Sequence, residues 1–166
     1  GNGTKKLNGH LQAGASVTID TAAVLDASPN GGIISYNLTI GGNWINNLWN
    51  ADSSKTGQFI PRTGTVTFIG NNINIYTGDS IKADHTGRTG KQFYNLVVNN
   101  RDNTVWTRLF PTYPGTSNNV RLANDLRVLN NFTLQKGIFY NYWDKIYVGG
   151  SFVNSGGDFQ MLGHYG

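Results

Sequence analysis

The sequence predicts an all-β fold in which the chain coils as a parallel β-solenoid, or β-helix, with loop insertions. Three observations predict it: a composition that disfavours helices, a period-two alternation of apolar and polar residues, and an inexact internal repeat. An antiparallel β-sandwich or jelly roll is the alternative, because those folds also use alternating strands.

The composition argues against helices before any pattern is considered. The 166-residue chain contains 22 Gly, Asn in similar abundance, and nine acidic residues that are all Asp. Asn and Gly disfavour helix interiors, whereas Glu, Ala, Leu and Lys favour them. An aromatic fraction of 12% argues against disorder, since burial of these rings can offset the entropy of ordering. We expect one β-solenoid domain over residues 1–166.

Alternation of apolar and polar residues predicts the individual strands. Leu38, Ile40, Gly42 and Trp44 share one parity, and polar residues lie between them. A helix cannot use that pattern, whereas a strand can direct the apolar parity inward. The expected strands lie within residues 17–19, 37–44, 65–69, 73–76, 96–98, 120–134 and 145–152. Asn-Gly, Gly-Gly and Asn-Asn steps separate them, and these steps tolerate the left-handed backbone of tight corners.

An internal repeat favours the solenoid. Residues 37–46 match residues 145–154, and the matched pairs include Leu38 with Ile146 and Trp44 with Phe152. Repetition of short strands and turns is typical of solenoids, and about 20–25 residues per coil gives about seven coils. Insertions near 47–56, 78–91 and 101–119 separate the matched strands. The core side chains, with repeat mates stacked on the same face, are expected to be Leu38, Ile40, Trp44, Ile146, Val148 and Phe152.

The repeat also carries a resemblance. The segment 37–46, followed by Gly-Gln-Phe-Ile-Pro-Arg-Thr-Gly-Thr-Val-Thr-Phe-Ile-Gly-Asn at 57–71, resembles the repeats of large bacterial surface and adhesin-type β-solenoid proteins. The resemblance covers residues 36–76 well, and 93–100 and 120–159 fairly. It implies a scaffold at a cell surface.

Few residues point to catalysis, and we expect no enzyme activity, no metal and no cofactor. The chain has no Cys, and its three His lack metal-ligand spacing. The Asp residues mostly stand singly beside Gly, Asn or Ser, which is typical of turn capping. The densest polar group, Asp79, Lys82, Asp84 and His85, is expected to be a solvated loop.

Charge and aromatic residues bear on partners. The net charge of +4 comes from scattered Lys and Arg, so we expect no nucleic-acid partner, and no apolar run is long enough for membrane insertion. Aromatic residues near Arg can seal contacts between subunits or stack on glycans. The candidate assembly or ligand surface consists of Trp106, Arg108, Phe110, Tyr113, Tyr142 and Trp143.

The two ends of the predicted coil supply the functional hypothesis. Neither residues 1–12 nor residues 155–166 contain an amphipathic capping helix, and open strand edges recruit other strands. More repeats of a longer chain, or another copy of this chain, could cover these edges. We expect the second: a structural protein, extracellular or at the cell surface, whose copies assemble end to end into a filament or surface layer. The alternatives are a carbohydrate-binding adhesin module, with extracellular glycans as partners, and a phage tail-spike-like fibre domain.

Overall fold

The structure of the chain is a computed structural model that describes residues 3–46, 57–71, 73–79, 82–100, 119–122, 124–141 and 144–161. Regular structure in these residues consists of strands, and they contain no helix. A membrane-crossing helix is accordingly absent from the described part of the chain. The expectation of an all-β fold is confirmed.

The strands form four sheets. Sheet I contains, in spatial order, β1 (Gly3–Lys6), β4 (Ala23–Asp26) and β7 (Gln58–Ile60). Sheet II contains β16 (Phe152–Asn154), β13 (Phe132–Lys136), β10 (Asn95–Asn99), β8 (Thr65–Phe68), β5 (Leu38–Ile40) and β2 (Leu11–Ala13). Sheet III contains β17 (Asp158–Met161), β14 (Ile138–Asn141), β11 (Asn119–Leu122), β9 (Ile73–Tyr76), β6 (Trp44–Asn46) and β3 (Val17–Ile19). Sheet IV contains β12 (Leu126–Val128) and β15 (Ile146–Val148).

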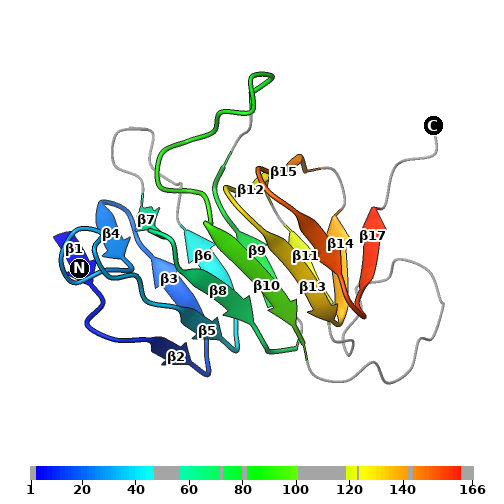
Figure 1. Cartoon of the computed structure of the whole chain (residues 1–166), viewed down its shortest axis with the longest axis horizontal. Helices are drawn as coiled ribbons and strands as arrows, with labels where there is room; N and C mark the ends of the chain where they lie inside the picture. Colours follow the sequence, from blue (N-terminus) through cyan, green and yellow to red (C-terminus); the bar gives the residue numbers. More distant parts are fainter. Residues whose placement is uncertain are drawn as a thin grey trace.

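Sheets I and IV are linked by the segment 90–93. The Phe59 N–H donates to the Gly90 carbonyl at 2.8 Å, and Phe93 forms a parallel bridge with Val128. Along the chain, successive strands therefore belong to sheet I or IV, then to sheet II, then to sheet III, and this order recurs. We call each of these three positions a side, and three consecutive segments, one on each side, a circuit. Figure 1 displays the circuits side by side from the N-terminal strands at the left to the C-terminal strands at the right.

Every ladder between these strands is parallel. The antiparallel sandwich or jelly roll therefore does not describe them. The described part of the chain has six strands in each of sheets II and III, rather than the about seven coils expected. Circuits are longer than expected because loops lie between the strands.

The core is built from columns of side chains that share one register position. In sheet II, Leu38 pairs with Val66, Val66 with Leu96, and Leu96 with Phe132. All four side chains are at most 1% exposed. Period-two alternation places this parity inward, so each circuit contributes apolar residues to one continuous core. Trp44 is also buried and contacts Phe59 and Phe93 at ring-centroid distances of 4.9 and 5.3 Å.

Corner asparagines explain part of the unusual Asn content. Asn37 Oδ1 accepts a hydrogen bond from the Thr65 N–H at 2.9 Å, and Asn131 Oδ1 accepts one from the Ser151 N–H at 3.0 Å. His10 Nδ1 has the same role toward the Asn37 N–H, at 3.0 Å. In each pair the acceptor side chain lies one circuit before the donor. These bonds satisfy backbone groups where the ladders stop.

The Gly-Gly corners are needed for close approach rather than for a left-handed backbone. Gly41, Gly42, Gly149 and Gly150 are not among the glycines with positive φ. A Cβ added to Gly42 would lie 2.5 Å from the Ser16 N of the preceding circuit. The expectation that these steps supply left-handed corners is therefore wrong at these four positions.

The internal repeat is real as a local pattern but does not follow the circuits. Leu38 lies in sheet II whereas Ile146 lies in sheet IV, and Trp44 lies in sheet III whereas Phe152 lies in sheet II. The expectation that repeat mates stack on one face is wrong. The motif encodes a strand, a corner and a strand, and the same unit fits at more than one corner.

The six expected core residues differ in burial according to the copy of the repeat in which they lie. Leu38, Ile40 and Trp44 are buried, as predicted. Ile146 and Val148 are half-buried and pack against the core, and Phe152 is 46% exposed. The second copy lies in the last circuit, where the described residues place no strand beyond it.

The three expected insertions are described unequally. Residues 47–56 lie outside the described residues, as do residues 101–119 except Asn119, which begins β11. The described residues of 78–91 connect β9 to β10 and rise above the strands in Figure 1.

Candidate assembly interface and ligand-binding hollow

The six residues predicted to form an assembly or ligand surface, Trp106, Arg108, Phe110, Tyr113, Tyr142 and Trp143, lie outside the described residues. Other residues form the candidate sites that the structure describes. They are the two end circuits, a hollow beside the last circuit, and a buried polar cluster around Lys91.

The last circuit, β15–β17, presents an apolar surface at the C-terminal end of the stack. Phe152 continues the sheet II column beyond Phe132, and their ring centroids lie 5.1 Å apart. Phe132 is fully buried whereas Phe152 is 46% exposed. Phe159, half-buried, lies 5.3 Å from Phe152. Phe152 is thus the exposed member of this aromatic pair, although its register partner Phe132 occupies a core position in the preceding circuit.

The first circuit, β1–β3, is less apolar. Leu11 and Val17 are half-buried core residues of β2 and β3. In β1, however, Lys5 occupies the register position of Leu25, and both Lys5 and Lys6 are exposed. Lysine on an edge strand opposes pairing with another strand. The two ends of the stack therefore differ in chemistry.

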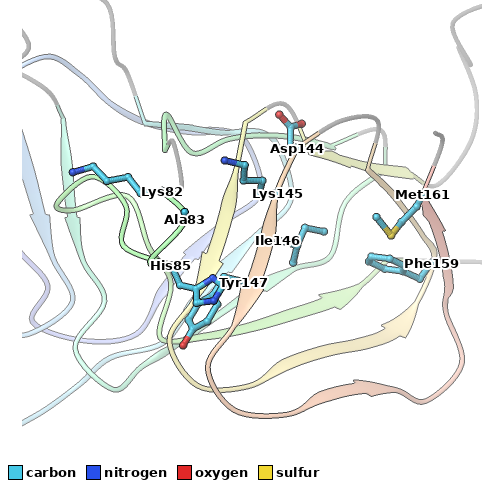
Figure 2. A pocket seen from close by; sticks show the side chains of 9 residues that line it. All are labelled: Lys82, Ala83, His85, Asp144, Lys145, Ile146, Tyr147, Phe159 and Met161. Atoms are coloured by element: carbon cyan, nitrogen blue, oxygen red, sulfur yellow. The ribbon is translucent and has the colours of Figure 1, made fainter. Parts of the chain in front are cut away.

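A hollow of about 720 Å³ lies between the turn 82–85 and the last circuit. Figure 2 displays its lining residues, which are Lys82, Ala83, His85, Asp144, Lys145, Ile146, Tyr147, Phe159 and Met161. The rings of His85 and Tyr147 stack with centroids 5.1 Å apart and planes at 17°. Flat rings beside Lys82 and Lys145 can contact a sugar ring and its polar substituents.

Local hydrogen bonds shape the turn that bears His85. The His85 N–H donates to the Lys82 carbonyl at 3.1 Å, and His85 has a left-handed φ of 63°. The Thr86 hydroxyl donates to Asp84 Oδ1 at 2.6 Å. This bond, together with one from the Thr86 N–H, lowers the pKa of the exposed Asp84. Lys82, Asp84 and His85 thus lie at the surface, as the sequence indicates.

Asp79 differs from the other three members of that group. It is 5% exposed, and its Oδ1 accepts a hydrogen bond from the Arg88 N–H at 2.6 Å. Arg127 Nε lies 3.5 Å from Asp79 Oδ2, and Arg127 Nη2 donates to Gln92 Oε1 at 3.0 Å. The expectation of a solvated loop is therefore wrong for Asp79, which joins the segment 78–92 to β12.

The buried polar cluster also contains a lysine, Lys91. Lys91 is 1% exposed, and its Nζ donates to the Gly57 carbonyl at 2.6 Å and to Asn46 Oδ1 at 2.7 Å. The pKa of Lys91 is lowered to about 8, mainly by burial and also by the charge of Arg88, while the charge of Asp79 opposes the shift. Sequence reasoning missed this residue, because nothing in Gly-Lys-Gln-Phe distinguishes a buried lysine from an exposed one.

The described residues contain no group of three or more His, Asp or Glu side chains that could hold a metal ion. No family model, curated protein or solved structure matches the chain. The geometry above is therefore the basis for assigning a function.

Proposed function

We propose that the chain is a β-solenoid and a non-catalytic structural subunit, extracellular or at the cell surface, whose copies assemble end to end into a filament or layer. The rotation of strands through three sides supports the solenoid, because each circuit then corresponds to one coil. Parallel ladders throughout the described strands support it as well, since sequential strands of a solenoid stack in this way.

The observation that carries the assembly proposal is the exposure of Phe152 on the last circuit. A core register position that is 46% exposed is stabilised when another circuit covers it. A strand added beside β16 or β17 would also extend the ladders of sheets II and III, which is β-augmentation. Copies joined head to tail in this way form an open filament.

Corner hydrogen bonds make the head-to-tail orientation specific. In the three corner pairs described above, which precede sheet II, the acceptor side chain lies one circuit before its backbone donor, as for Asn131 and Ser151. When the same rule is applied across the junction, the Ser151 hydroxyl oxygen of one copy accepts a hydrogen bond from the His10 N–H of the next copy. The N-terminal partner strands are then β2 and β3, because the lysines of β1 oppose pairing.

The test is assembly of the purified chain at high concentration, followed by sedimentation and negative-stain electron microscopy. We expect filaments, and we expect Phe152→Asp to raise the concentration needed for assembly at least about tenfold, which corresponds to about 1.4 kcal/mol per junction. Tyr76→Asp is the matched control, because Tyr76 is similarly exposed, at 42%, but lies mid-stack on β9. Deletion of residues 1–12 should also weaken assembly.

Three outcomes of that test count against the proposal. A chain that stays monomeric at high concentration removes the filament function. Filaments that form equally well with Phe152→Asp remove the proposed interface. A closed trimer instead favours the phage tail-spike-like fibre domain.

The hollow supports a second candidate, a carbohydrate-binding adhesin module. The stacked His85 and Tyr147 supply a flat surface of the kind that contacts sugar rings. Binding to a glycan array that is lost in Tyr147→Ala and retained in Tyr76→Ala would establish it. No binding by the intact chain would remove it.

A further inference from the structure

We infer that Lys91 and Asn46 are poised to form an isopeptide bond, a covalent amide that joins their side chains within the chain. Lys91 Nζ lies 2.7 Å from Asn46 Oδ1. The two residues are 45 positions apart in sequence, and their side chains are 1% and 2% exposed. The inference concerns the interior of the protein and does not rest on the proposed assembly.

The contact holds an amine against an amide carbonyl. The carbonyl carbon Cγ is one bond, about 1.2 Å, from the oxygen that Lys91 Nζ contacts, so it lies within reach of a small side-chain rotation. The Gly57 carbonyl, at 2.6 Å, and the Asn46 carbonyl, at 3.4 Å, fix Nζ from other directions. Asn46 Nδ2 donates to the Gly90 carbonyl at 2.9 Å, which fixes the amide. Because the amine and the amide are already held together, their reaction avoids the entropy loss of a bimolecular encounter.

The surroundings favour the reactive form of the amine. Only the neutral amine has the lone pair needed to attack, and burial lowers the pKa of Lys91 to about 8. Burial also separates the reacting groups from water, which would compete by hydrolysing the amide.

The step balances without any co-reactant. The Lys91 Nζ lone pair forms a bond to Asn46 Cγ, and the carbonyl electron pair moves to Oδ1. A proton passes from Nζ to Nδ2 within this tetrahedral intermediate, in which both nitrogens are bonded to Cγ. The carbonyl reforms, the Cγ–Nδ2 bond breaks, and ammonia leaves. The product is a secondary amide between residues 46 and 91, and nothing is oxidised or reduced.

The pH dependence of the reaction follows from the lowered pKa. The neutral fraction of the amine rises about tenfold per pH unit below pH 8 and levels off above it. Protein purified at pH 6 and moved to pH 9 should therefore cross-link about a hundredfold faster than protein kept at pH 6.

The deciding experiment is mass spectrometry of the intact chain and of its protease digest after incubation at pH 9. We expect an intact mass lower than the sequence mass by one ammonia, and one branched peptide that contains residues 46 and 91. The branched peptide is required because a succinimide at Asn2-Gly3, Asn8-Gly9 or Asn30-Gly31 also loses one ammonia. Linear peptides alone, with Lys91 cleaved by trypsin, would overturn the inference.

Three variants separate the chemistry from folding. Lys91→Arg keeps a buried cation but should yield no branched peptide. Asn46→Asp should yield no branched peptide, because an amine does not attack a carboxylate at pH 9. Asn37→Ala removes a corner asparagine that bonds to Thr65 and should cross-link like the parent chain; a parent chain that stays linear would again contradict the inference.

Discussion

Asp26 and Arg62 form a two-point ion pair that joins the end of β4 to the turn after β7. Arg62 Nε donates to Asp26 Oδ1 at 2.9 Å, and Arg62 Nη2 donates to Asp26 Oδ2 at 2.7 Å. The Asp26 side chain is 4% exposed and that of Arg62 is 26% exposed. A planar fork that meets a buried carboxylate in this way is among the stronger charged contacts in proteins.

Removal of the carboxylate should therefore be costly. We expect Asp26→Ala to lower the free energy of unfolding by about 2–3 kcal/mol, because the Arg62 guanidinium loses both acceptors. Asp84→Ala, which removes an exposed turn contact to Thr86, should have a much smaller effect. Urea unfolding of the two variants measures the difference. Equal midpoints would mean that the ion pair contributes nothing beyond a surface contact.

Trp44 tests the aromatic core. The side chain is 1% exposed and contacts Phe59 and Phe93, so Trp44→Ala leaves a large cavity and should cost about 3–5 kcal/mol. Tyr76→Ala, on the neighbouring strand of sheet III, should cost less than about 1 kcal/mol. Thermal unfolding followed by circular dichroism can compare them. A neutral Trp44→Ala would contradict the packing described for sheets I and III.

Gly70 tests close approach between circuits. A Cβ at this position would overlap the Gly41 carbonyl oxygen, so the backbone must shift. We expect Gly70→Ala to destabilise the chain by about 1–3 kcal/mol or more. At Gly14, where an added Cβ meets no heavy atom within 4 Å, the same substitution should be close to neutral. A neutral Gly70→Ala would mean that the circuits are spaced more widely than described.

The lysines of β1 should limit assembly. Replacing both Lys5 and Lys6 by Thr removes exposed charges from an edge strand, and we expect filaments at a lower protein concentration than for the parent chain. Light scattering during a concentration series measures the threshold. An unchanged or higher threshold would show that β1 does not limit the junction.

The sequence predicted strands where alternation is strong and the element is buried. The expected runs 17–19, 65–69 and 73–76 coincide with β3, β8 and β9. Six strands were missed, because a strand of three or four residues offers little alternation to recognise: β1, β2, β4, β7, β14 and β17. The long run 120–134 proved to be three strands separated by corners, which period two alone cannot distinguish because the parity continues through them.

The candidate site was less predictable than the fold. Exposure of Phe152 depends on which circuit comes last, and burial of Lys91 depends on the carbonyl of Gly57 and the side chain of Asn46, both distant in sequence. Neither relationship leaves a periodic signal. The repeat also led to a wrong prediction. Residues that match in sequence were expected to lie on the same face, but they lie in different sheets.

That mismatch between repeat and circuit has a consequence for how such a chain can change over generations. A strand–corner–strand unit that fits at more than one corner can be copied or lost without adding a whole circuit. In the solenoid proposed above, each such event would rotate everything downstream by one side around the axis. A loop carried by a downstream corner would then face a different direction with its own sequence untouched, so the orientation of surface features can vary independently of the residues that compose them.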